Sequence, residues 1–431
     1  MDYWCALWFW PIEQADLLPS RTEFLFDLTM ILEGTPANTS RVSAQSLFDE
    51  VTDVTQGEQL LLDFASKFTE GSIVDLDQLC SMFPRMELVR KIAEANKFMH
   101  WELEFAELFA ERGGFDLIIG NPPWVLLGWN EQDVLSDCQP IFAIKKLNAT
   151  QTMQQRNRVL IYRNIKDLYF REYEAISGQQ AFLNATQNYK ELVGMKANLY
   201  KCFLPQAWLF ANNNGVSAFI HPDGVYDDPN GGLLRDQLYP KLRYHFQFTN
   251  ERRLFEEVHH NTVYSLNIYC NEESKEFDSI SNLFDPITVE QCYDENINGL
   301  IPGIKDENGW CISGHPSRVV IIGKEELKLF AKIFDGSDNW KQARIPVLHT
   351  KVFADVLECF ANAKMKVSEI EEKIYTTVMW DETATQNNGI IKRNVHFPLT
   401  SIDTIEKFGQ YKNGTKLNEA VPLFMRIDAK K

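Results

Sequence analysis

The chain has 431 residues, enough for roughly two or three domains. Its hydrophobic content of 45% and aromatic content of 12% exclude a disordered chain and indicate a large packed interior. The formal net charge of −17 counts against a protein that binds nucleic acid over its whole surface.

The N-terminal apolar run and the cysteines indicate a cytoplasmic protein. Residues 3–10 are apolar, but a membrane span needs about 20 such residues and a signal peptide needs a basic start. We therefore expect no membrane association, and we expect Pro11 to end a buried aromatic segment. The eight Cys lack the close spacing of a zinc site, which predicts reduced core thiols and no bound metal.

Hydrophobic periodicity predicts helices that alternate with strands. The expected helices cover residues 20–32, 47–68, 88–109, 199–210 and 233–242. The expected strands cover residues 115–119, 216–220, 244–249 and 263–269, with a turn at 212–215. This alternation predicts an α/β domain with a mainly parallel sheet. Residues 275–431 are loop-rich, and we expect a second domain there.

One segment of this acidic chain is basic. Residues 145–201 hold ten Lys or Arg against four Asp or Glu. Such a segment can follow a phosphate backbone, or it can be an ordinary solvated helical face. The candidate DNA contacts are Lys145, Lys146, Arg156 and Arg158.

The segment GGFDLIIGNPPW, residues 113–124, is a buried-strand pattern that ends in an Asn-Pro-Pro-Trp loop. The exocyclic amine of adenine is a poor nucleophile because its lone pair is delocalised into the ring. The side-chain carbonyl of Asn121 and the main-chain carbonyl of Pro122 can accept both amine hydrogens and aim the lone pair at a methyl donor. Pro122 and Pro123 stiffen the loop, and Trp124 offers a face on which a base can stack.

By itself, Asn-Pro-Pro is a common turn sequence. Its position directly after a buried strand makes the catalytic interpretation stronger, because α/β folds keep their sites at the carboxyl ends of the strands.

The run HWELEFAELFAERGGFDLIIGNPPW, which begins at His100, resembles the fourth motif of the gamma-class adenine DNA methyltransferases. More narrowly, it is similar to the methylases of type IIG restriction–modification and related phage-defence systems. Residues 198–203 (NLYKCF) resemble the fifth motif of that family, and residues 253–258 (RLFEEV) resemble its eighth. Residues 376–398 are similar to the start of a target-recognition region.

The resemblance implies a Rossmann-like methyltransferase sheet that transfers a methyl group from S-adenosylmethionine to a flipped adenine in DNA. It assigns the donor pocket to Asn198, Tyr200 and Phe203, and it makes Phe255 the second aromatic face beside Trp124. Tyr200, Phe203 and Phe255 also suit ordinary core positions.

The first motif of the family, a glycine turn after a strand that cradles the donor, is not found in the sequence. Gly113 and Gly114 precede a strand instead of following one. We therefore expect an incomplete sheet made of the later strands, weak binding of S-adenosylmethionine by the chain alone, and a separate polypeptide that supplies the donor-binding half.

The resulting division is an aromatic and helical N-terminal segment (1–111), a catalytic core with helical insertions (112–272) and the start of a mixed recognition region (273–431). Two other functions stay open. One is a methyltransferase that acts on a protein glutamine or an RNA base. The other is a catalytically incomplete DNA-binding or scaffold subunit of a defence complex.

Overall fold

The computed structural model describes residues 1–33, 76–145, 147–196, 198–306 and 309–363, together with 385 and 388. The chain divides into two compact units, residues 1–362 and 363–431. The expected helix at 47–68, Lys146 and nearly all of the recognition-like segment 376–398 lie outside the described residues.

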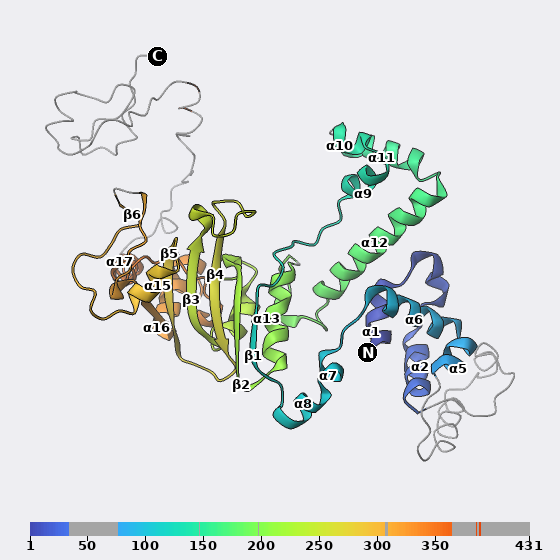
Figure 1. Cartoon of the computed structure of the whole chain (residues 1–431), viewed down its shortest axis with the longest axis horizontal. Coiled ribbons are helices and arrows are strands. Elements are labelled where there is room, and N and C mark those ends of the chain that lie inside the picture. The colour runs from blue at the N-terminus through green and yellow to red at the C-terminus, as the bar shows by residue number, and fades with distance from the viewer. Residues whose placement is uncertain are drawn as a thin grey trace. The chain divides into compact units, whose positions relative to one another are not determined.

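A six-stranded sheet forms the centre of the first unit, in the order β1-β2-β4-β3-β5-β8 (Figure 1). Its strands are β1 (Phe115–Gly120), β2 (Ala211–Pro222), β3 (Leu242–Thr249), β4 (Val263–Cys270), β5 (Glu276–Leu283) and β8 (Val320–Gly323). A separate two-stranded ribbon pairs β6 (Lys305–Asp306) with β7 (Gly309–Trp310). The four strands expected from the sequence are present.

The sheet is mixed. β1 pairs in parallel with β2, and β3 pairs in parallel with β5, whereas β4 and β8 run in the opposite direction. The strand β4 lies between β2 and β3 because the short connection after β3 turns the chain back on itself. The sheet also continues beyond residue 272, since β5 and β8 extend it past the boundary expected for the core.

The expected turn at residues 212–215 lies inside β2. The register passes from Phe115 opposite Ala211 to Leu117 opposite Val216, so the extra residues of β2 bulge out of the ladder. A Cβ atom on Gly215 would lie 2.7 Å from the main-chain oxygen of Phe115. The glycine therefore serves close strand packing at the bulge rather than a free turn.

Two apolar layers cover the faces of the sheet. On one face, α13 (Leu199–Phe210) and α14 (Gly232–Leu238) pack against β2 and β4, with Leu204, Leu234 and Tyr269 fully buried. The other face carries Phe246, Phe248, Tyr264, Ile280 and Leu283, against which Trp124 and Phe255 pack. The remaining helices of this half are α15 (Ile287–Cys292), α16 (Lys324–Phe330) and α17 (Lys351–Ala361).

The N-terminal residues form a helical cluster of their own. Its helices are α1 (Asp2–Ala6), α2 (Arg21–Glu33), α5 (Leu76–Met82) and α6 (Pro84–Asn96), which share one apolar core. The helix expected at 20–32 is confirmed as α2. The one expected at 88–109 is broken, because Lys97 takes a left-handed conformation (φ 52°) that ends α6. The chain resumes as α7 (Trp101–Glu104) and α8 (Ala106–Arg112).

A helical arm, residues 131–184, is inserted between β1 and β2 (Figure 1). It consists of α9 (Glu131–Cys138), α10 (Ile141–Ile144), α11 (Ala149–Val159) and the long α12 (Arg163–Asn184). α12 packs against the N-terminal cluster at Gly178, where a Cβ atom would lie 2.6 Å from the main-chain oxygen of Trp8. The neck of the arm is closed by a bridge between Leu126 and Asn198.

β1 is an edge strand of the sheet. Among the described residues only β2 pairs with it, and Leu117 and Ile119 on it are 57% and 73% exposed. Natural proteins usually protect such an edge with charges, prolines or a covering element. The outer edge of β1 is therefore an apolar strand edge that is open to another strand.

The paired glycines before β1 have different tasks. Gly113 ends α8 in a left-handed conformation (φ 73°) with free space around it, whereas a Cβ atom on Gly114 would lie 2.4 Å from the main-chain oxygen of Phe210. We expect Gly113→Ala to cost about 1 kcal/mol of unfolding free energy. Gly114→Ala should cost 1 to 3 kcal/mol more, because the backbone of 210–212 must move. Urea unfolding of both variants measures this, and equal losses would contradict a packing role for Gly114.

Candidate active site

The Asn-Pro-Pro-Trp loop leaves the carboxyl end of β1, beside the carboxyl end of its parallel neighbour β2. Asn121 is exposed, and its side-chain amide makes no hydrogen bond to any described residue. An acceptor in this position is available to a ligand without first breaking an internal contact. The side chain of Pro122 is buried, so the loop is anchored immediately after Asn121.

Contacts on both sides hold the loop in place. The indole N–H of Trp124 donates to the main-chain oxygen of Ile220, at 3.4 Å. Further along, the main-chain N–H of Leu199 donates to the oxygen of Val125, at 3.0 Å. The start of α13 is thereby tied to the loop, as the sequence resemblance requires of residues 198–203.

Trp124 and Phe255 are brought together as expected. Their ring centroids are 5.7 Å apart at an interplanar angle of 62°, and Tyr264 contacts both rings, at 5.7 Å and 5.1 Å. A base stacked between two parallel rings needs two van der Waals separations, roughly 7 Å. In this arrangement the rings touch each other edge to face, so a base can enter only when they separate.

The fully buried Asn250 sets the position of Phe255. Its side-chain oxygen accepts from the N–H of Phe255 at 3.0 Å, and its amide donates to the main-chain oxygens of Phe255 and Val258, each at 2.8 Å. The side chain of Asn250 thus does the work of a strand partner for the loop after β3. The sequence analysis missed this residue, although an Asn in a loop directly after a strand is a signal for such a turn.

The three candidate donor-pocket residues lie in different surroundings. Phe203 is 45% exposed and lines a cavity, whereas Tyr200 is 2% exposed and stacks on His221 at 5.3 Å. The side-chain oxygen of Asn198 is buried and has no hydrogen-bond partner among the described residues. Tyr200 therefore occupies a core position, and Asn198 has an acceptor that a bound group could satisfy.

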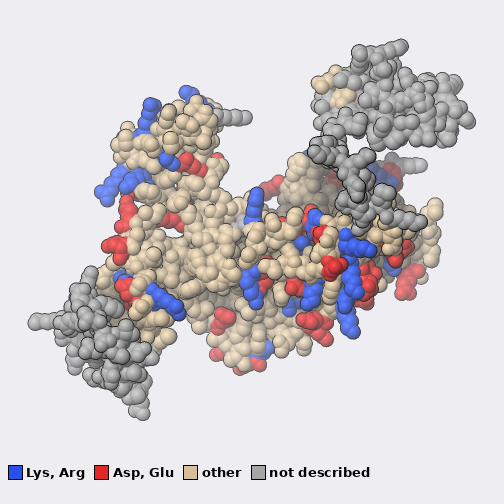
Figure 2. Space-filling model, turned by 180° about the vertical axis from the view of Figure 1, so that it is seen from behind, with Lys and Arg blue, Asp and Glu red and all other residues tan. Residues whose placement is uncertain are grey.

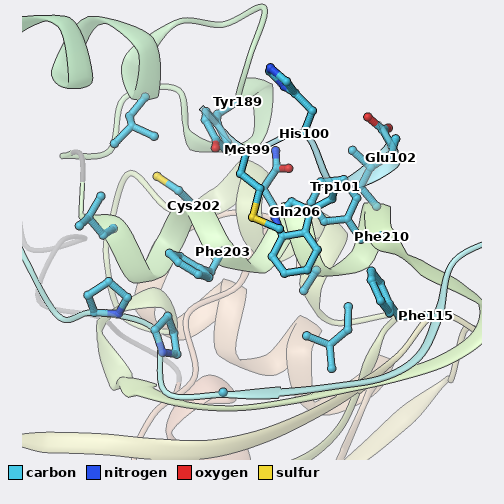
Figure 3. Close-up of a pocket in the computed structure, with 18 of the residues that line it drawn as sticks. Met99, His100, Trp101, Glu102, Phe115, Tyr189, Cys202, Phe203, Gln206 and Phe210 are labelled. Atoms are coloured by element: carbon cyan, nitrogen blue, oxygen red, sulfur yellow. The ribbon is translucent and has the colours of Figure 1, made fainter. Parts of the chain in front are cut away.

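The cavity next to the loop has a volume of about 890 Å³ (Figure 3). Asn121, Pro122 and Pro123 line it, together with apolar side chains of β1, α13 and the N-terminal segment. Figure 3 shows Phe203 and Gln206 of α13 at the cavity together with Trp101 of α7. Its volume falls in the range of pockets that hold a nucleoside-sized ligand. The polar side chains in its described wall include His100, Glu102, Asn121 and Gln206.

A buried polar network lies beyond the end of β2. His221 is fully buried, and its Nδ1 donates to the main-chain oxygen of Pro222 at 2.9 Å. Its Nε2 then accepts from the hydroxyl of Tyr269 and the amide of Asn267, both at 3.0 Å. Burial lowers the pKa of His221 to about 4, so the ring is neutral at pH 7.

Asp223, two residues further on, accepts from His245 Nε2 at 2.8 Å and from Gln247 Nε2 at 2.5 Å. Burial alone would raise the pKa of Asp223, but the nearby His245 and these hydrogen bonds lower it overall. The sequence analysis interpreted His221-Pro-Asp-Gly as a turn only. The structure adds that its carboxylate anchors the loop to β3.

The candidate DNA contacts lie on the arm. Arg158 is exposed, and Lys145 is exposed at the end of α10, whereas Arg156 is held by Glu131 at 3.0 Å. Figure 2 shows basic side chains gathered at the end of the arm. Lys146 lies outside the described residues. The arm therefore presents positive charge, but Arg156 is partly neutralised by its ion pair.

Residues 58–156 match the model of the Eco57I restriction-modification methylase family. The matched segment contains β1, the Asn-Pro-Pro-Trp loop and the first half of the arm. The match supports a restriction–modification methylase. No protein of curated function matches the sequence.

Several solved structures show a limited likeness to the chain. A DrdV–DNA complex has 15% identity over 42% of this chain with a TM-score of 0.22, and the type IIG restriction endonuclease BpuSI has 19% identity over 32% with a TM-score of 0.23. This chain spans 16% of the length of each. A chain of a type I restriction–modification system has 12% identity over 83% of this chain and 89% of its own, with a TM-score of 0.26. Scores this low do not establish a common fold.

Two further searches concern the described residues only. They contain no group of three or more His, Cys, Asp or Glu side chains placed to hold a metal ion. They also contain no helix that is both long and apolar enough to cross a membrane.

The neutral His221 predicts a pH dependence of stability. Because its pKa is lower in the folded protein (about 4) than in the unfolded chain (6.5), its contribution is complete above pH 6.5 and is lost as the pH falls toward 4. The loss should be on the order of 3 kcal/mol. Urea unfolding between pH 7 and 4.5 should show a flatter profile for His221→Gln than for the wild type. The exposed His259→Gln serves as the control, and identical profiles for all three proteins would contradict the buried neutral ring.

Proposed function

We propose that this chain is the catalytic part of an adenine-specific DNA methyltransferase of a restriction–modification or phage-defence system. The carrying observation is the free side-chain acceptor of Asn121 at the carboxyl end of β1, beside an aromatic cluster and a nucleoside-sized cavity. The family match of residues 58–156 supports the same class of enzyme.

The loop acts on the amine by orientation. Asn121 and the main-chain carbonyl of Pro122 accept the two hydrogens of the exocyclic amine, which draws its lone pair out of the ring plane. An amide cannot take up a proton at neutral pH, so the proton leaves the amine during or after transfer. Because the prolines fix the loop beforehand, the acceptors need no rearrangement at the moment of reaction.

The aromatic cluster receives the flipped base. Trp124 and Phe255 contact each other in the free protein, and separating them exposes two faces for the adenine. The cost of parting the rings is offset by stacking, which is worth roughly 1 to 3 kcal/mol per base. Closed rings also keep water from the apolar site until the base arrives.

S-adenosylmethionine supplies an electrophilic methyl group when it is bound. The cavity volume and the aromatic wall at Phe203 suit the nucleoside part of that molecule, and the buried oxygen of Asn198 suits a hydrogen-bond donor. These residues form one wall of a donor pocket that opens toward Asn121. We assign that wall to Phe203 and Asn198, and we assign Tyr200 to the core behind it.

The open edge of β1 supports a second component. An exposed apolar edge strand beside a half-walled cavity suits the addition of another strand, carried by a separate polypeptide or by another part of a longer one. A glycine turn after that strand would place main-chain N–H groups at the cavity, where the carboxylate of the donor needs them. The chain alone should therefore bind S-adenosylmethionine weakly.

The grip on the amine is tested by Asn121→Ala and Asn121→Asp. With labelled S-adenosylmethionine and adenine-rich duplex DNA, the Ala variant should lose at least about a hundredfold in methyl transfer, since one preorganised contact is removed. The Asp variant should keep part of the rate, because a carboxylate oxygen can still accept one hydrogen. The exposed Asn213→Ala on the bulge of β2 is the control.

DNA affinity should be unchanged in all three variants. Full transfer by Asn121→Ala would exclude the proposed mechanism. Transfer to protein or RNA instead of DNA would exclude the substrate. If the wild-type chain is inactive alone, the same comparison is made after the polypeptide that restores activity is added.

Asn250 should act on the base through Phe255. We expect Phe255→Ala and Asn250→Ala to weaken binding of a duplex with a mismatched adenine by a similar factor, roughly tenfold. The double variant should be no weaker than either single one, because the two changes remove the same interaction. Fluorescence of 2-aminopurine at the mismatch measures the extruded base, and additive losses would show that Asn250 acts elsewhere.

A further inference from the structure

The turn between α11 and α12 leaves large apolar side chains in solvent. Ile161 is 79% exposed and Tyr162 is 61% exposed, at the end of the arm where α9, α10 and α11 gather around α12 (Figure 1). Nearby on α10, Ile144 is 78% exposed. Together they form an apolar tip on an otherwise polar arm.

The arm has a well-packed core of its own, so the exposed tip is not a general failure of packing. Leu135, Phe142, Val159 and Tyr169 are between 1% and 9% exposed. Val159 is buried, and two residues later Ile161 is in solvent. Single exposed apolar residues are normal, but a group of them at the end of a long helix marks a contact surface.

Positive charge surrounds this tip. Residues 141–171 contain seven Lys or Arg and one Asp or Glu, in a chain whose net charge is −17. Arg158 is exposed just before the turn, and Arg163, just after it, has a side chain that is 94% exposed. Figure 2 shows the basic side chains of the arm near its end.

This combination fits duplex DNA. Arginines beside the tip can contact phosphates, while apolar side chains between them can enter between base pairs from the minor groove. A protein partner would also cover apolar side chains, but it would need an acidic rim to match these arginines. The charge therefore favours DNA as the occupant.

We propose that Ile161 and Tyr162 form a wedge that inserts into the duplex, with Arg158 and Arg163 on the flanking phosphates. The proposal rests on the proposed function only in taking DNA as the substrate. A wedge kinks the duplex and weakens stacking, and a weakly stacked base is easier to extrude. The arm would then contribute to base flipping at a distance from Asn121.

The experiment uses the full chain, a fluorescent 30-base-pair duplex and a second duplex with 2-aminopurine at successive positions. The double variant Ile161→Ala/Tyr162→Ala should bind roughly tenfold more weakly and lose the unstacking signal, with an unchanged salt dependence. Arg158→Ala/Arg163→Ala should flatten the salt dependence by about 1.8, or 0.9 per phosphate. The control is Val352→Ala/Phe353→Ala, which removes side chains that are 53% and 50% exposed on α17.

The outcomes separate this proposal from the proposed function. Normal affinity and normal unstacking in the Ile161/Tyr162 variant would overturn the wedge, while methyl transfer by that variant would leave the enzyme assignment standing. A wild-type chain that binds no DNA would overturn both. Loss of self-association in place of DNA binding would assign the tip to a protein contact and overturn the wedge. Thermal melts check that each variant is folded.

Discussion

The parallel pairing of β1 with β2 is the contact on which the candidate site depends. It sets Asn121 at the same edge as Pro222, which brings Trp124 against the end of β2 and close to the loop after β3. That pairing requires the main chain to pass within touching distance of residues 210–212, which Gly114 alone permits. A residue that carries no chemistry therefore decides where the chemistry can be placed.

The aromatic cluster and the hydrogen bonds of Asn250 show a division of labour at this edge. Trp124 is held through the loop and the end of β2, whereas Phe255 is held through a single buried amide on the neighbouring strand connection. The two rings therefore belong to separately anchored segments. A small shift of one segment changes the gap between the rings while the sheet beneath stays intact.

The sequence predicted the strands near the site well, because short apolar runs bounded by glycine and proline leave few alternatives. It also predicted that Trp124 and Phe255 would meet. It did not predict the bulge at 212–215, since asparagines and a glycine signal a turn whether or not the strand continues through them. The burial of Tyr200 and the network around His221 were also beyond reach, because both depend on partners such as Tyr269 that lie far away in sequence.

The neck of the arm has a consequence for how such a protein can diversify. Leu126 and Asn198 pair across the two chain segments that enter and leave the arm, so the insertion is closed at its base like a loop on a clip. Exchanging everything beyond the clip for a short linker or for a different helical module costs the sheet little, because loop-closure entropy grows slowly with length. The part that touches the substrate backbone can therefore be replaced as a cassette, while the catalytic edge passes unchanged from one lineage to the next.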